Sequence, residues 1–273
     1  AVHQAGGRIA AQINHGGMQC DPKSVVGTIA PSAVDESFLS QPARETTLDE
    51  IEVLIDAYAQ AARRAKEAGF DAVQIHAAHG YLISQFISPY TNQRTDEWGG
   101  NLQGRTRFLR EVARLIREQV GPDYPVLIKF GMEDGRQGGL TPEAGADVVA
   151  MLVDMGINAV EISGGVGAKN IRKGIRSASR EAYFRPLTQL AKKKTALPII
   201  LVGGMRSVVM MEDVLSSGDA DFIAMSRPLI NDPNFPNLLQ AGKLDVSECI
   251  SSSNCWAKNL SEGIACKCPP LKS

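Results

Sequence analysis

The feature that most constrains this chain is a short apolar run, rich in Val and Ile, that recurs six times. Each run is followed by a loop and then by a helical pattern. The runs occupy residues 7–14, 72–76, 126–130, 159–162, 198–202 and 221–225. Fully apolar strands of this kind are typical of parallel sheets covered by helices. The rhythm predicts an α/β fold and leaves open a doubly wound sheet or a (β/α)8 barrel.

Cap and turn residues indicate where three of the helices begin and end. Thr47 and Glu50 form a T-x-x-E capping box, and apolar residues at helical spacing follow it. Glycines that suit helix ends then precede the next strands. Helices are expected over about residues 47–69, 104–121 and 141–156.

Composition narrows the classes of function. The chain has 273 residues, 44% hydrophobic and 22% charged, with a formal net charge of −1. A nucleic-acid-binding or polybasic membrane surface is not expected from this balance. No apolar stretch reaches the ~18 residues of a spanning helix, and residues 1–17 do not read as a secretory signal. We therefore expect a cytoplasmic protein with a small-molecule substrate, and leave a homo-oligomer open.

The most informative residues follow the second run. There the chain reads from His76 through His79 to Tyr81, so two imidazoles and a phenol lie within six residues. Sites in both candidate folds lie at the carboxyl ends of strands. These side chains can direct hydrogen-bond donors at one oxygen atom. In a purely structural role, His76 would pack in the core and His79 would cap a turn; the group of three favours a site.

A longer pattern begins at the same point. Residues 76–108 read HAAHGYL, QFISP, NQRTD, GG and RTRF in turn. This spacing resembles the signature of the Old Yellow Enzyme family, and the likeness extends over about residues 6–236. Trp98 stands where the family usually has Tyr, and Gly104 where it often has Asn. Both positions lie outside the reacting residues.

The resemblance implies an incomplete (β/α)8 TIM barrel that contains about its third to eighth strands. A full domain of this class usually has 250 residues or more, so about 80–100 residues are expected to be absent. Residues 1–240 would form the barrel and residues 241–273 a Cys-containing tail. The implied function is FMN-dependent reduction, with NADH or NADPH, of activated C=C bonds in enones, enoates or enoyl thioesters.

The resemblance also implies catalytic roles. His76 and His79 would hold the substrate carbonyl oxygen and stabilise enolate charge, and Tyr81 would supply the proton. We do not expect His76 and His79 to bind a metal. A catalytic zinc site needs a third protein ligand, and the other histidines, His3 and His15, lie near the start of the chain.

Two expected cofactor contacts lie on strands. Gln12 carries both an amide donor and an acceptor, as a pyrimidine-like flavin edge requires. Lys129, at the end of its strand, could stabilise negative charge near flavin N1 and O2; alternatively, it is an ordinary solvated lysine. Near Gln12, Met18 replaces the Arg of the family.

The remaining cofactor contacts are expected in loops. Glycine turns let a phosphate approach the backbone, and an arginine offers a charge-assisted donor. Ser226 stands where the family has Gly. The residues are Gly164 after the sixth strand of the implied barrel, Gly203 and Gly204 after the seventh, and Ser226 and Arg227 after the eighth.

The tail contains four of the five cysteines, which suggests metal binding before disulfides. Relatives similar to 2,4-dienoyl-CoA reductase bind a four-iron cluster here. Cys249, Cys255 and Cys266 match three of the four ligand positions and Ser252 takes the other, while Cys268 is additional. Because four thiolates normally hold such a cluster, we predict that the tail holds no intact one.

Two other functions are weighed against the flavoenzyme. The chain could be a truncated, non-catalytic barrel that no longer holds FMN. It could also be a flavin-free phosphate-binding barrel such as an aldolase. Apart from Lys129, no lysine lies mid-strand as a Schiff-base former, which disfavours the aldolase.

Overall fold

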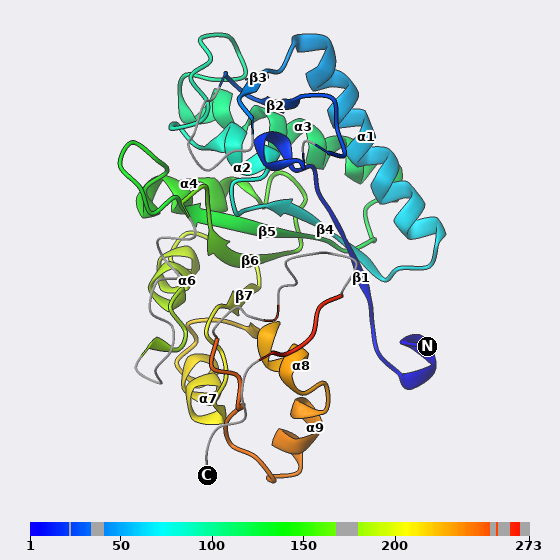
Figure 1. Ribbon diagram of the computed structural model, residues 1–273, viewed down its shortest axis with the longest axis vertical. Helices are drawn as coiled ribbons and strands as arrows, with labels where there is room; N and C mark the ends of the chain where they lie inside the picture. Colours follow the sequence, from blue (N-terminus) through cyan, green and yellow to red (C-terminus); the bar gives the residue numbers. More distant parts are fainter. Residues whose placement is uncertain (22, 34–40, 168–179, 252–254, 256–262, 268–273) are drawn as a thin grey trace.

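The computed structural model describes residues 1–21, 23–33, 41–167, 180–251, 255 and 263–267. Within them, six parallel strands form one sheet whose spatial order follows the chain. A doubly wound sheet would instead reverse its strand order at a switch point, so that alternative is wrong. Figure 1 shows the sheet curling into a half-barrel. The strands are β1 (Ala10–Ile13), β4 (Ala72–Ala77), β5 (Val126–Glu133), β6 (Ala159–Gly164), β7 (Ile199–Val202) and β8 (Phe222–Ala224).

Helices cover the outer side of this sheet (Figure 1). The longer ones are α1 (Leu48–Glu67), α3 (Leu102–Val120), α4 (Pro142–Met151), α6 (Arg185–Lys192) and α7 (Val208–Ser216). A short α2 (Leu82–Ile87) follows β4, and α8 (Arg227–Asn231) and α9 (Phe235–Gln240) follow β8. The six βα units of the sequence are therefore present.

The predicted helix starts are confirmed within a few residues. Thr47 and Glu50 form the capping box of α1. The Thr141 side chain accepts from the backbone of residue 144 at the start of α4. The end of α4 is predicted too late, because the helix stops at Met151 and a turn leads to Gly156, whose φ is +72°.

The two faces of the sheet differ in polarity. Outward-facing Val73, Ile128 and Val160 are fully buried beneath the helices. Inward-facing positions carry polar side chains on β1, β4, β5 and β6. The expectation of fully apolar strands is therefore wrong for the inner face, and this face positions the candidate site.

Some local structure is absent from the sequence-based expectation. The strands β2 (Thr28–Ala30) and β3 (Ala43–Glu45) form a small parallel pair. Two 3-10 turns, η1 (His3–Ala5) and η2 (Gly17–Gln19), also lie in the first third of the chain. Met18, at the position where the family has Arg, is buried with β2 and β3. Beyond residue 240, the Asp245 carbonyl accepts from the backbone N–H of Val208, so this segment packs against α7. The domain boundary at 240 stays a prediction.

Candidate active site

A polar row of four side chains crosses the inner face, one from each of four neighbouring strands. Gln12 Nε2 on β1 donates to Gln74 Oε1 on β4 at 2.6 Å. Gln74 Nε2 donates in turn to Glu161 Oε2 on β6 at 2.9 Å. Lys129 on β5 forms an ion pair with the other carboxylate oxygen of Glu161. The Lys129 and Glu161 side chains are only 13% and 11% exposed, so the alternative of a solvated lysine is wrong.

The reactive loop, residues 76–81, lies at the carboxyl end of β4 beside this row. The His76 ring centroid is 5.1 Å from that of His79 and 4.9 Å from that of Tyr81. Strand register sets His76 beside Lys129. The structure therefore brings the three predicted catalytic side chains together, next to the predicted flavin lysine.

The protonation state of His76 follows from its surroundings. Its ring is buried, and its Nδ1 accepts from the backbone N–H of Ala78 at 3.3 Å. Burial, assisted by the charge of Lys129, lowers the pKa of His76 from its ordinary value of 6.5 to about 4. His76 is thus neutral at pH 7. Because Nδ1 accepts, Nε2 carries the proton and is the donor that the ring offers.

His79 is held by the end of β6. Its φ of +60° is unusual for a residue other than glycine. Its backbone N–H donates to the Gly164 carbonyl at 2.8 Å. Its Nε2 lies 2.7 Å from Ser163 Oγ, within hydrogen-bonding distance. Sequence analysis assigned no role to Ser163, Glu161 or Gln74. The feature that could have identified them is the alternation of polar and apolar residues along their strands, which places the polar residues on the inner face.

The two predicted phosphate-binding turns lie side by side. Gly203 and Gly204 follow β7, Ser226 and Arg227 follow β8, and these strands pair through their last residues. Both glycines have positive φ, 110° and 73°. The φ of Gly203 favours glycine, and a Cβ there would also lie 2.6 Å from the Tyr183 ring. Arg227 Nη1 donates to the Ser251 carbonyl at 3.1 Å.

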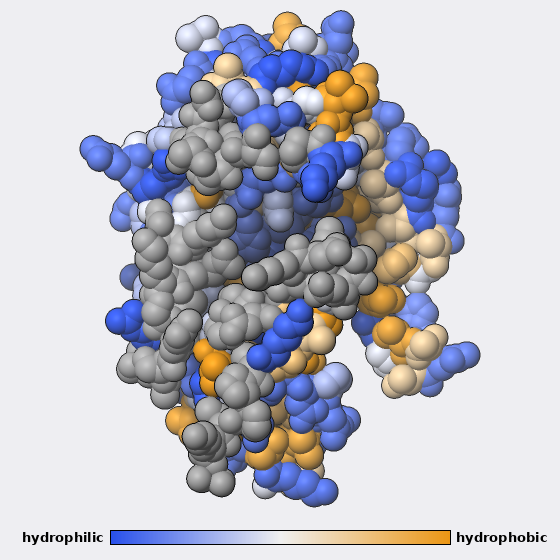
Figure 2. All heavy atoms as spheres, in the orientation of Figure 1, coloured by the Kyte–Doolittle hydropathy of each residue, from blue (hydrophilic) through white to orange (hydrophobic). Residues whose placement is uncertain are grey.

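The donor set of the inner face fits FMN. The row supplies amide donors, an amide acceptor and one cation, which suit the polar edge of an isoalloxazine ring. The Gly203–Gly204 turn supplies a backbone that a phosphate can approach closely. Figure 2 shows hydrophilic side chains at the centre of this view, where the surface is hollowed. The flavin assignments of Gln12 and Lys129 stay predictions.

The rest of the signature folds into a support loop, residues 92–104. Asn92 Nδ2 donates to the carbonyls of Phe86 and Trp98 at 2.7 and 2.8 Å. Buried Arg94 donates through Nη1 to the carbonyls of Pro31 and Thr46 at 2.9 and 2.8 Å. These contacts satisfy backbone groups of neighbouring segments, so this half of the signature has a structural role.

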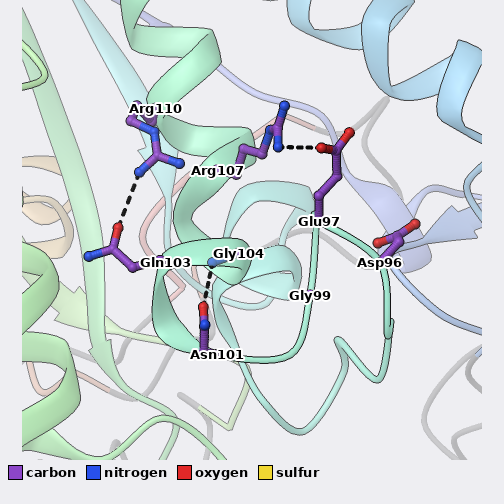
Figure 3. Close-up of a pocket in the computed structure, with 8 residues that line it drawn as sticks. All are labelled: Asp96, Glu97, Gly99, Asn101, Gln103, Gly104, Arg107 and Arg110. Atoms are coloured by element: carbon purple, nitrogen blue, oxygen red, sulfur yellow. Dashed lines mark hydrogen bonds and ion pairs between the residues drawn. The ribbon is translucent and has the colours of Figure 1, made fainter.

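The support loop also forms a pocket with the first turns of α3 (Figure 3). Asn101 Oδ1 accepts from the Gly104 N–H at 3.0 Å and caps the helix. Arg107 pairs with Glu97 across the pocket at 2.6 Å. A Cβ on Gly104 would collide with the Gly99 carbonyl oxygen, which explains why a glycine occupies this position in the chain. The pocket lining includes no side chain of the polar row.

The predicted ligand cysteines are only partly described. Cys249 and Cys255 are buried, and Cys266 Sγ accepts from Asn231 Nδ2 at 3.4 Å. Ser252 and Cys268 lie outside the described residues. Among described residues, no three His, Cys, Asp or Glu side chains form a group that could hold a metal ion. Nor does any helix in the described ranges have the length and apolar character needed to cross a bilayer.

Comparison with known proteins places the chain among flavoenzymes. The NADH oxidase of Thermoanaerobacter brockii is 37% identical over 272 residues, which are 98% of this chain and 42% of that protein. A solved 2-naphthoyl-CoA reductase bound to 2-naphthoyl-CoA aligns with a TM-score of 0.85 and 30% identity over 90% of this chain and 40% of that one. The chain thus spans less than half the length of both relatives.

A solved Old Yellow Enzyme homologue from Zymomonas mobilis aligns with a TM-score of 0.74 and 29% identity, over 91% of this chain and 71% of that one. This agrees with the resemblance carried by residues 76–108. Residues 1–245 match the NADH:flavin oxidoreductase / NADH oxidase family as a whole. Because the match covers most of the sequence, this chain belongs to that family of FMN- and NAD(P)H-dependent enzymes.

Proposed function

We propose that this chain is the FMN-binding part of an oxidoreductase that reduces activated C=C bonds with NADH or NADPH. In this proposal the strands of the large sheet, β1 and β4 to β8, are strands three to eight of a (β/α)8 barrel. Residues 241–273 form a tail without an intact iron–sulfur cluster. The observation that carries the proposal is the juxtaposition of His76, His79 and Tyr81 with Lys129 on one inner face.

The binding roles follow from position. Lys129 and Gln12, both members of the polar row, would hold the polar edge of FMN. Gly164 contributes backbone at the end of β6. The two turns would hold the phosphate, with Arg227 as its charged donor; the turn residues are Gly203, Gly204, Ser226 and Arg227. When bound, FMN supplies the redox chemistry, taking a hydride from the nicotinamide and giving one to the substrate β-carbon.

The chain's own side chains activate the alkene. The neutral His76 ring offers its Nε2–H to the substrate carbonyl oxygen, and His79 is the second donor. Negative charge develops on this oxygen as the β-carbon gains hydride, and donors already in position stabilise it. Because its pKa is about 4, His76 acts as a hydrogen-bond donor and not as a cation at pH 7. The Tyr81 hydroxyl then delivers the proton to the α-carbon.

This arrangement selects for a carbonyl conjugated to the alkene, because both histidines act on that oxygen. Enones, enoates and enoyl thioesters share this feature. The similarity to a reductase solved with 2-naphthoyl-CoA supports an acyl thioester within the class.

The test is the alkene half-reaction. The protein is loaded with FMN, reduced anaerobically and mixed with an enoate or an enoyl thioester. The saturated analogue serves as the control. Return of the oxidised flavin spectrum with the alkene alone is the expected result. A loaded protein that no activated alkene reoxidises would contradict the proposal, and a protein that takes up no FMN would favour a non-catalytic barrel.

A further inference from the structure

We propose that Glu161 is the residue that sets how strongly this site favours reduced over oxidised FMN, by countering the charge of Lys129. Glu161 is a positioning residue in this scheme and does not itself touch the substrate. The inference rests on the proposed binding of FMN at the inner face.

Glu161 fixes the hydrogen-bond direction along the polar row. A carboxylate only accepts hydrogen bonds. Gln74 must therefore turn its Nε2 to Glu161, and its Oε1 then faces Gln12. Gln12 must donate in its turn, which leaves its Oε1 and second N–H to point away from Gln74. The groups that Gln12 presents therefore depend on Glu161, which lies three strands away in the sheet, on β6.

Glu161 also sets the charge that Lys129 presents. Their ion pair is largely buried, with both side chains less than one-seventh exposed. A pair in such surroundings is screened weakly by salt. Lys129 is also close enough to His76 to influence its protonation, so its charge extends to the reactive loop. The net field at the inner face therefore depends on both members of the pair.

The consequence concerns the reduced flavin. Two-electron reduction of FMN places negative charge near N1, and a nearby lysine favours that form. With Glu161 ionised, this preference is partly cancelled. Without its charge, Lys129 acts in full, and the ratio of the oxidised to the reduced dissociation constant rises. The ion pair therefore keeps bound FMN more reducing than Lys129 alone would.

The experiment measures the midpoint potential of bound and free FMN by anaerobic equilibration with a redox dye. Glu161→Gln keeps the shape and removes the charge. We expect the dissociation-constant ratio to rise about tenfold, which is about 30 mV for a two-electron couple. Glu118→Gln, on the exposed side of α3, removes an equal charge and is expected to leave the ratio unchanged.

A second background separates a charge effect from a packing effect. In Lys129→Met, the positive charge that Glu161 is proposed to counter is absent. Adding Glu161→Gln to that variant is then expected to change the ratio less than about twofold. Should Glu161→Gln not fold, Glu161→Asp withdraws the carboxylate from Lys129 and is expected to raise the ratio in the same direction.

The outcomes are distinct. An unchanged ratio in Glu161→Gln, or in Glu161→Asp if it is used instead, overturns the inference while FMN binding stands. A tenfold rise that persists in the Lys129→Met background overturns it as well, because Glu161 would then act without Lys129. Failure of the native protein to bind FMN removes the proposed function, and the inference with it.

Discussion

The two loops that contain the sequence signature, residues 76–81 and 92–104, have different roles in this molecule. The reactive loop, residues 76–81, presents side chains to one another and to the inner face, and includes the positive φ of His79. The support loop, residues 92–104, directs its polar side chains at backbone carbonyls and at its own carboxylates. Adjacent motif residues therefore divide into those that meet a ligand and those that hold the frame.

Because of this difference, mutations in the two loops are expected to have different effects. Changes in the support loop should lower the free energy of unfolding, because they leave buried backbone groups without partners. Changes in the reactive loop and the turns should, at neutral pH, mainly alter binding or rate in a protein that remains folded. A support-loop variant that alters only binding or rate would contradict the comparison.

The largest effect is expected at Arg94. Arg94→Ala removes buried donors from the carbonyls of Pro31 and Thr46 and leaves Asp96 without its main partner. The free energy of unfolding, measured by urea denaturation, should fall by about 3–5 kcal/mol. Arg114→Ala, which removes an exposed arginine from α3, is the control and should cost no more than about 1 kcal/mol. Equal losses in the two variants would disprove the support role.

A stability effect is also expected in the reactive loop, from protonation of His76. The pKa of His76 is about 4 when folded and about 6.5 when unfolded, so the unfolded chain binds more protons between these values. Stability is therefore lost as pH falls from about 6.5 towards 4, by about 3 kcal/mol in total at 1.36 kcal/mol per unit. Urea unfolding of His76→Gln should show a flatter pH dependence over this window. Identical curves would contradict a buried, neutral His76.

The main effect of a change at Arg227 is expected on FMN binding. Arg227→Ala removes a charged donor worth about 1.5–3 kcal/mol, so FMN should bind about 10- to 100-fold more weakly in a fluorescence titration. Arg227→Lys keeps the charge and should lose less. Riboflavin, which lacks the phosphate, should bind both variants like the native protein. A similar loss for riboflavin would place Arg227 away from the phosphate.

The smallest effect is expected at Ser163. Ser163→Ala removes the hydroxyl next to His79 Nε2, and one such hydrogen bond is worth about 1 kcal/mol. The alkene half-reaction should slow about fivefold, with flavin reduction by NAD(P)H unchanged. Ser163→Thr retains the hydroxyl and should recover most of the rate. Slowing of both half-reactions would show a role in folding instead.

Prediction from the sequence succeeded where local rules decide the structure. Six strands, their parallel direction, the capped starts of α1 and α4 and the approximate extent of α3 follow from apolar runs, caps and glycines. The grouping of His76, His79 and Tyr81 follows from their position after one strand. The doubly wound alternative could be discarded only from the three-dimensional structure, because the alternation of strands and helices along the sequence does not reveal the spatial order of the strands.

Contacts between residues far apart in the sequence could not be predicted from local patterns. Glu161 lies 32 residues from Lys129 and 87 from Gln74, and only strand register brings them together. Ser163 meets His79 across 84 residues for the same reason. The strands β2 and β3 have three residues each, too few for a pattern to stand out. Sequence reasoning therefore located single residues and missed their partners.

The central claim is that the reactive loop acts on the substrate oxygen, and stopped-flow kinetics of the two half-reactions test it most directly. In His76→Ala and His79→Ala, loss of one donor should slow flavin reoxidation by the alkene by about 2.7–4 kcal/mol in activation free energy. Reduction of the flavin by NAD(P)H should change little, since no enolate forms in that step. If the alkene half-reaction keeps its native rate in both variants, the reactive loop does not have the role assigned to it.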